Sequence, residues 1–261
     1  MKLFKITALF IFVAIMIAAC DKKDEPSKEE IEKMENQFIE FASELESKIK
    51  GIDTSLNLAY FDASINSKPE NWEKVEKLDM KRNEILSNKE DFQKLKEFKE
   101  SGLIKDHIQN RRLNVLYNTY LGNQLDTALL NEMTKLFTKI ETKYTGYRAE
   151  VDGEKLSDND VEEVLKTSTD NERLEKVWKA HKDIGPVVKD DILQLVRLRN
   201  KAAKELGFDN YHQMSLQLSE QDPDEIEALF DKLDTLTRDA FVGLKKEIDT
   251  HLANLYGVGE E

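Results

Sequence analysis

The amino-acid sequence predicts an all-α protein, a multi-helix array, and three observations carry this prediction. Apolar residues recur at three- and four-residue spacing through most of the chain, which places them on one face of a helix. The ten glycines and four prolines, few for 261 residues, fall almost entirely between the periodic segments. Ser-x-x-Glu and related capping-box pairs stand where such segments begin. For strands, at most a brief pairing around Val151 is expected.

The part of the chain before residue 102 contains four predicted helices. The first opens at the capping box Ser27-x-x-Glu30 and is expected to end at Gly51, because glycine readily adopts the left-handed conformation that follows a helix. The second is expected over residues 53–67, the third from Pro69 onward and the fourth over residues 89–99. The buried side of the third helix is expected to carry Trp72, Val75, Leu78 and Ile85.

Seven further helices are expected, over residues 103–121, 126–150, 157–166, 169–185, 187–206, 209–219 and 222–256. The last has the clearest start, since Asp222-Pro223-x-Glu225 joins an N-cap, a proline at the first helical position and a capping-box glutamate. At 1.5 Å per residue this helix is roughly 50 Å long. Aromatic residues in this part of the chain are expected to pack in the core: Trp178, Phe208, Tyr211, Phe230 and Phe241.

The N-terminus has the pattern of a processed export signal. Lys2 and Lys5 precede an apolar run over residues 6–19, which is shorter than the about 20 residues of a membrane-spanning helix. The run ends in Ile17-Ala18-Ala19-Cys20, which resembles a bacterial lipobox, so residues 1–19 are interpreted as a lipoprotein signal peptide and Cys20 as the lipidation site. An ordinary signal peptide followed by a chance cysteine is the alternative.

The lipobox interpretation predicts a location in the bacterial cell envelope. Residues 20–27 then form the lipidated cysteine and a polar tether, and the partner of this end is the membrane, on its periplasmic or its outer side. Cys20 is the only cysteine, so its lipidation leaves no thiol for a disulfide or a thiolate–metal site. The formal net charge of −13 argues against a nucleic-acid partner, because phosphate backbones attract clustered lysine and arginine.

Motifs for known chemistry are missing from the sequence. Zinc hydrolases with the His-Glu-x-x-His motif need two histidines four residues apart, and the four histidines here are isolated: His107, His181, His212 and His251. There is neither a Gly-x-Ser-x-Gly elbow nor a glycine-rich phosphate loop. The acidic group from Glu220 to Glu225 stands at a helix N-terminus, where negative charge is favoured. We therefore predict no catalytic and no metal-binding residue in this chain.

Four segments, in this order, nevertheless resemble one family of helical zinc peptidases, the angiotensin-converting-enzyme-like (peptidyl-dipeptidase A) metallopeptidases, especially the bacterial members. The segments are RRLNVLYNTYLGNQL (residues 111–125), VLKTSTDNERLEKVW (164–178), LVRLRNKAAKELGFDNYHQMSLQL (195–218) and the helix over residues 225–256. The resemblance is good from about Ile104 to Gly257. Thimet-oligopeptidase-like peptidases, which share the pattern around Arg199-Asn200, are the competing assignment.

The resemblance implies an architecture and an activity. Residues 28–103 would form lid-like helices and residues 104–257 one wall of the substrate groove, with zinc as the cofactor and a peptide as the substrate of the complete enzyme. In this family the zinc-binding helix lies downstream of the position of Gly257, so no zinc or catalytic residue is transferred to this chain. Residues 258–261 are then a truncated end, and the chain alone is expected to be inactive.

A second function class remains open from the sequence. The chain can also be interpreted as a non-catalytic envelope lipoprotein whose helices form a binding or partner module. The predicted helix over residues 225–256 favours the peptidase interpretation, because it carries more apolar residues than a terminal helix normally covers, from Ile226 to Leu255.

Overall fold

The computed structural model describes residues 26–259, and the all-α prediction is confirmed: the described chain is helical apart from one short hairpin. The predicted signal peptide of residues 1–19 and the predicted lipidation site Cys20 lie outside the described residues. The elements are α2 (Lys28–Ile65), α3 (Pro69–Leu86), α4 (Lys89–Ser101), α5 (His107–Leu121), α6 (Thr127–Gly146), β1 (Ala149–Val151), β2 (Glu154–Leu156), α7 (Asp158–Thr167), α8 (Asn171–Lys182), α9 (Ile184–Glu205), α10 (Tyr211–Leu218) and α11 (Pro223–Tyr256).

The prediction that Gly51 ends the first helix is wrong. Helix α2 starts at the predicted capping box of Ser27 and Glu30 and continues through Gly51 to Ile65. A glycine inside a helix costs about 1 kcal/mol relative to alanine. Packing on both sides of Gly51 outweighs this cost, because Phe38 and Leu45 are buried in one cluster and Ala59 and Ala63 in another.

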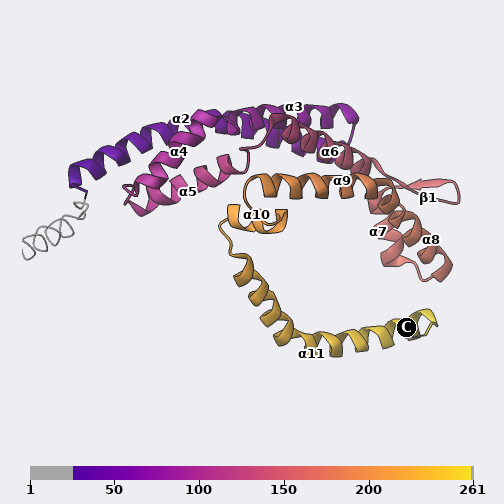
Figure 1. Cartoon of the computed structure of the whole chain (residues 1–261). Helices are drawn as coiled ribbons and strands as arrows, with labels where there is room; N and C mark the ends of the chain where they lie inside the picture. Colours follow the sequence, from indigo (N-terminus) through magenta and orange to yellow (C-terminus); the bar gives the residue numbers. More distant parts are fainter. Residues whose placement is uncertain (1–25, 260–261) are drawn as a thin grey trace, which may run out of the picture.

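The long helix α2 runs along the top of the molecule in the view of Figure 1, and α3, α4 and α5 pack against it. Its N-terminal half packs with α4 and α5 around a core that includes Phe38, Leu95, Leu113 and Tyr120. Its C-terminal half packs along α3, with Trp72 and Val75 buried between them as predicted. Helix α3 in turn packs on α6, and α6 packs on α9, so successive layers lead from α2 down to α9.

The brief pairing expected around Val151 is present as a hairpin. Strands β1 and β2 pair antiparallel, with Ala149 opposite Leu156 and Val151 opposite Glu154. The hairpin joins α7 and α8 in a separate small core that includes Leu156, Val161 and Val177. Helix α6 therefore ends at Gly146, before the predicted limit at residue 150.

Other helix starts differ from the prediction by a few residues for identifiable reasons. Helix α5 begins at His107 because the side chain of Asp106 accepts hydrogen bonds from two backbone N–H groups of the first turn. Asp170, not Thr169, caps α8 in the same way. Helix α9 begins at Ile184 and includes Gly185 and Pro186, since a proline in the first turn removes only an N–H that has no helical partner.

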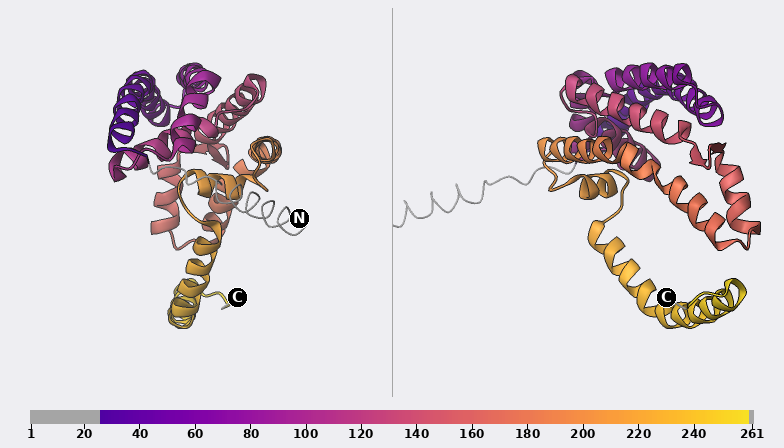
Figure 2. Two further views of the ribbon diagram at one scale, coloured as in Figure 1. Left: turned by 60° about the vertical axis from the view of Figure 1, so that its left-hand side comes forward. Right: turned by 90° about the vertical axis from the view of Figure 1, so that its right-hand side faces the viewer.

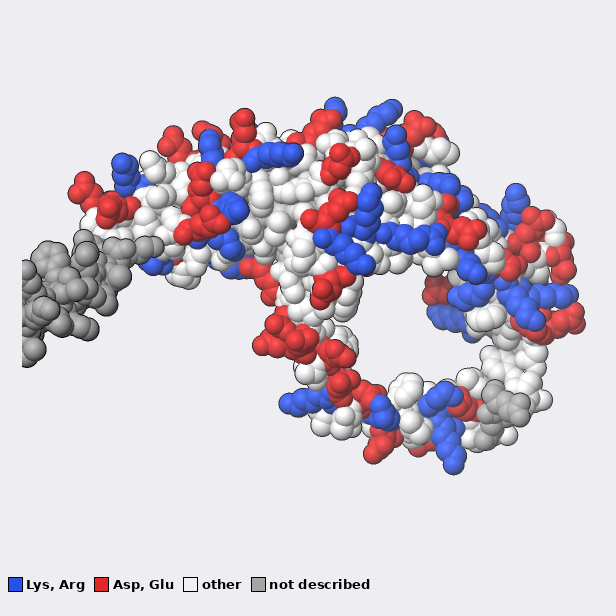
Figure 3. All heavy atoms as spheres, viewed as in Figure 1, with Lys and Arg blue, Asp and Glu red and all other residues white. Residues whose placement is uncertain are grey.

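Helix α11 extends away from the other helices, as Figures 1 and 2 show. It starts at the Asp222-Pro223 cap that the sequence predicts, next to α10, and ends below α8 in the view of Figure 1. There Asn171 Nδ2 donates a hydrogen bond of 2.9 Å to the carbonyl oxygen of Tyr256. None of its side chains is buried by the described residues. The space-filling view shows the opening that α11 encloses with the body of the molecule (Figure 3).

A buried carboxylate fastens α6 to α9. Asp191 of α9 is 8% exposed and accepts hydrogen bonds from the ammonium groups of Lys139 (2.7 Å) and Lys143 (2.6 Å) of α6. The hydrogen bond from Lys139, followed by that from Lys143, lowers the pKa of Asp191. Ionised Asp191 therefore stabilises the layer of α6 on α9.

The first prediction concerns Gly51. Apart from the glycine's chain neighbours and its own helix backbone, no heavy atom of residues 26–259 lies within 4 Å of the position that a Cβ would occupy there, and the residue is helical. Gly51→Ala is therefore expected to raise the free energy of unfolding by about 0.5–1 kcal/mol, measured by urea unfolding. Gly102→Ala is the control with the opposite expected effect. Gly102 has a φ of +63°, a left-handed conformation in which an alanine is strained, so this substitution should lower the free energy of unfolding. A destabilising effect of Gly51→Ala would show that α2 bends or breaks at this residue.

The second prediction concerns the pH dependence of stability. Because the folded-state pKa of Asp191 lies below its unfolded value, its contribution is present above about pH 4 and is lost as the pH falls through the folded pKa. Asp191→Asn is expected to lower the free energy of unfolding by about 1–2 kcal/mol at pH 7. The difference from the unsubstituted protein should shrink below about pH 4. Asp190→Asn, at an exposed neighbouring residue, is the control; an equal effect there would contradict the role of Asp191.

Candidate functional site

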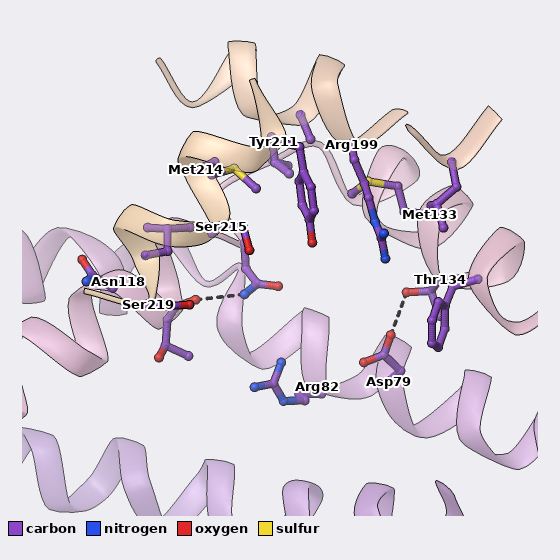
Figure 4. A pocket seen from close by; sticks show the side chains of 18 residues that line it. Asp79, Arg82, Asn118, Met133, Thr134, Arg199, Tyr211, Met214, Ser215 and Ser219 are labelled. Carbon is purple, nitrogen blue, oxygen red and sulfur yellow. Dashed lines mark hydrogen bonds between the residues drawn. The ribbon is translucent and has the colours of Figure 1, made fainter. Parts of the chain in front are cut away.

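The candidate site is a cavity of about 510 Å³ between the upper and lower layers of helices. Its walls come from α3, α5 and α6 on one side and from α9 and α10 on the other. Figure 4 shows the labelled side chains entering the cavity from these opposed helices. Two residues from the segment predicted to be lid-like, Asp79 and Arg82, therefore meet residues from the segment predicted to be the groove wall.

Helix α10 presents a row of hydroxyl groups to the cavity. Tyr211, Ser215 and Ser219 follow one another at intervals of four residues, which places them on one side of the helix and its C-cap. The start of the helix is fixed twice: Asn210 accepts from the N–H of Gln213 at 2.9 Å, and Asn200 Oδ1 of α9 accepts from the N–H of Tyr211 at 3.0 Å.

Within residues 26–259, Arg199 is the cation of the cavity wall that has no carboxylate partner. Its guanidinium carbon lies 5.0 Å from the centre of the Tyr211 ring, within the range of a cation–π contact. Among the described residues, no carboxylate oxygen lies within 4.0 Å of its nitrogen atoms. Arg82, by contrast, is neutralised by an ion pair of 2.7 Å between its Nε and Asp53 Oδ1.

A polar network on α3 and α6 forms the opposite wall. Thr134 Oγ1 donates a hydrogen bond of 2.8 Å to Asp79 Oδ2 and accepts one of 3.1 Å from Asn83 Nδ2. Asn83 and Thr134 are 8% and 7% exposed. Asp79 has no lysine, arginine or histidine nitrogen within 4.0 Å in the part of the chain that the structure describes. Asp79 of α3 and Arg199 of α9, neither of which has an ionic partner among the described residues, therefore face the cavity from opposite walls (Figure 4).

The two helices that flank the opening, α9 and α11, both carry exposed apolar side chains, and these are a second feature. Helix α9 contributes Val187, Ile192, Leu193 and Val196 to the large apolar side chains that are exposed. Helix α11 contributes a longer set over its whole length: Leu229, Phe230, Leu233, Leu236, Phe241, Val242, Leu244, Ile248, Leu252 and Leu255. We call this second set, without Val242, the apolar stripe of α11, because Val242 lies on the other side of the helix.

The expected core packing of the aromatic residues is wrong for most of them. Trp178 is 52% exposed, and Phe230 and Phe241 are each 64% exposed. Phe208 and Tyr211 are only partly buried. The spacing of these residues correctly indicates helical faces, but spacing alone does not show whether another helix of the same chain covers the face.

The described chain is a helical array with one short hairpin, an opening enclosed by α11 and a cavity of mixed polar and apolar lining, which is large enough for a small ligand. A comparison of the sequence with known protein families finds a match. Residues 32–256 match the M2 peptidase family, which is described as angiotensin-converting enzyme. The chain therefore belongs to this peptidase family, as the resemblance indicates. A comparison with curated proteins gives no match.

The residues described here do not fit the zinc ion that the family implies. His181 lies 3.6 Å from Asp158, beside the end of α2, whereas His212 lies on α10 and His251 on α11. Within residues 26–259, no three side chains of histidine, cysteine, aspartate or glutamate gather as a metal site. We derive no chemical step through zinc from these residues.

The helices of the described residues were compared with the length and apolar character of membrane-spanning helices. No helix within residues 26–259 combines the length and the apolar character needed to cross a bilayer.

The third prediction concerns the wall of the cavity. Thr134→Val keeps the shape of the side chain but leaves the buried amide of Asn83 and the carboxylate of Asp79 without their shared partner. The free energy of unfolding is expected to fall by about 1–3 kcal/mol, the cost of an unsatisfied buried polar group. Thr142→Val is the control on the same helix, since within the described chain its hydroxyl bonds only the Thr138 carbonyl of its own helix. An equal loss in both variants would contradict the network.

Proposed function

We propose that this chain forms the N-terminal part of a zinc-dependent, peptidyl-dipeptidase-like metallopeptidase that hydrolyses peptides. In this proposal α9, α10 and α11 form one wall of the substrate groove, and α2–α4 form its cover. The residues that hold zinc and cleave the peptide come from polypeptide outside residues 26–259, on the same chain or on a partner.

The observation that carries the proposal is the apolar stripe of α11. It follows the helix for almost its full length and lies on the surface of the described chain. A contiguous apolar patch of this kind marks a surface that another protein segment covers. The match of residues 32–256 to a peptidase family supports a segment of that same peptidase as the covering partner.

The proposal includes the expected anchoring of the protein. A lipid on Cys20 would hold the described domain at the membrane surface through the short tether before α2. The enzyme would then act on peptides in the bacterial cell envelope.

A second candidate function is a non-catalytic binding module of the envelope. One observation favours it: α11 contacts α10 at its start and is bonded to Asn171 of α8 at its end, so the chain alone fixes both ends of the helix. A module of this kind would bind its partner without any peptide cleavage.

Peptide hydrolysis separates the two candidates. The chain is to be combined with a polypeptide from a related family member that carries its His-Glu-x-x-His segment, and cleavage of a fluorogenic peptide is measured with and without a metal chelator. The peptidase proposal expects cleavage only when both polypeptides and zinc are present. Stable association of the two polypeptides without any zinc-dependent cleavage would favour the binding module.

The fourth prediction tests the apolar stripe itself. Leu244→Asp places a charge on a side chain that is 56% exposed, so the free energy of unfolding of the chain alone is expected to change by less than about 0.5 kcal/mol. Association with the catalytic polypeptide, and with it cleavage, is expected to fall by at least about tenfold, because a charge would be buried without a partner. Thr235→Asp is the matched control, because Thr235 is nine residues from Leu244 and therefore lies on the opposite side of α11.

A large loss of stability in Leu244→Asp would show that the chain itself covers the stripe. Equal association of the Leu244→Asp and Thr235→Asp variants would show that the stripe is not the contact surface.

A further inference from the structure

The cavity between α3 and α9 contains two opposite charges that no described side chain neutralises. Arg199 extends into it from α9, and Asp79 faces it from α3 (Figure 4). Within the described chain the two groups are more than 4.0 Å from each other and from any other ionic partner. Opposite charges that are held apart across a cavity are complementary to a ligand that carries both signs.

The shape and the remaining lining narrow the class of ligand. The volume of about 510 Å³ lies within the about 300–1,000 Å³ of small-molecule sites. Met133, Phe137 and Leu195 provide apolar surface in the same cavity. The hydroxyl groups of Tyr211 and Ser215 lie on the side of Arg199, where they are able to donate hydrogen bonds to an anionic group.

We propose that this cavity binds a small zwitterion, namely an apolar amino acid or a short peptide with free termini. Arg199 holds the carboxylate, with Tyr211 and Ser215 as further donors. Asp79, oriented by Thr134, holds the ammonium group, and the apolar side chain of the ligand packs on Met133 and Phe137. This site goes beyond the proposed function, because it requires neither zinc nor the residues that cleave a peptide.

A ligand of a single charge fits the cavity less well. A simple anion would pair with Arg199 but would lie in the field of the unpaired carboxylate of Asp79. A simple cation would pair with Asp79 but would be repelled by the guanidinium of Arg199. Arg82 does not change this balance, since Asp53 already neutralises it at 2.7 Å. The charges of the wall thus favour a ligand with no net charge and two charged ends.

The first part of the test varies the ligand and leaves the protein unchanged. Binding to the purified full chain is measured by calorimetry with leucine, leucyl-leucine, N-acetyl-leucine and leucinamide. Leucine or leucyl-leucine is expected to bind. Tighter binding of leucine would identify the ligand as a free amino acid, and tighter binding of leucyl-leucine would identify it as a short peptide. Removal of either charge, in N-acetyl-leucine or in leucinamide, is expected to weaken binding by about tenfold or more, because a charge-assisted hydrogen bond is lost.

The second part varies the protein. Arg199→Gln is expected to weaken binding of leucine by about tenfold or more but to have little effect on leucinamide, which already lacks the carboxylate. Asp79→Asn is expected to show the reverse selectivity, affecting leucine and sparing N-acetyl-leucine. Arg197→Gln is the matched control, because Arg197 is exposed on the same helix and does not line the cavity. Arg199→Lys should retain part of the affinity.

Three results would overturn the proposal: absence of binding of both zwitterions, equal binding of the capped and uncapped ligands, or equal effects of Arg199→Gln and Arg197→Gln. Should a variant fail to fold, the ligand series on the unsubstituted protein still decides. All readouts are binding constants of this chain, so their failure leaves the proposed peptidase function untouched.

Discussion

The position of α6 between α3 and α9 is the constraint on which the rest of the structure depends. On one side its Thr134 shares hydrogen bonds with two side chains of α3. On the other side its two lysines bond Asp191 of α9. Since α9 leads directly into α10 and α11, these two polar contacts set the distance between the upper helices and everything that follows along the chain. Apolar packing alone would hold the layers together without fixing their register so narrowly.

The cavity is a consequence of this arrangement. Helices α3 and α9 lie on opposite sides of α6, so side chains that extend past α6 from each of them face one another without touching. Asn200 then fixes the turn that brings α10 and Tyr211 against Arg199. Contacts with neighbouring side chains thus hold the two charged groups in place: Tyr211 contacts Arg199, and Thr134 bonds Asp79. The two charged groups do not pair with each other. Such preorganised, unpaired groups are a property of binding sites more than of packing surfaces.

Local sequence signals predicted most of the helices, because caps act within a few residues: Ser27, Ser157 and Asp222 start helices where the sequence places them. They failed at Gly51, where packing of distant residues on both sides outweighs the propensity of one glycine. They also failed for the cavity, because Asp79 and Arg199 are 120 positions apart and only the tertiary fold brings them together. The four-residue spacing of Tyr211, Ser215 and Ser219 was the available local signal for that site, and it indicates a shared face without naming its ligand.

Helix α11 connects the fold to the proposed function. A helix that only linked α10 to α8 would need apolar residues near its ends, where the chain contacts it. Its apolar stripe instead continues from Leu229 to Leu255, including the middle of the helix, which lies far from the other described helices (Figure 1). Exposure of so many large apolar side chains is costly in water, and sequences keep such a pattern where a partner covers it. The extent of the stripe therefore supports a covering segment that runs along the whole helix, as the second half of a groove would.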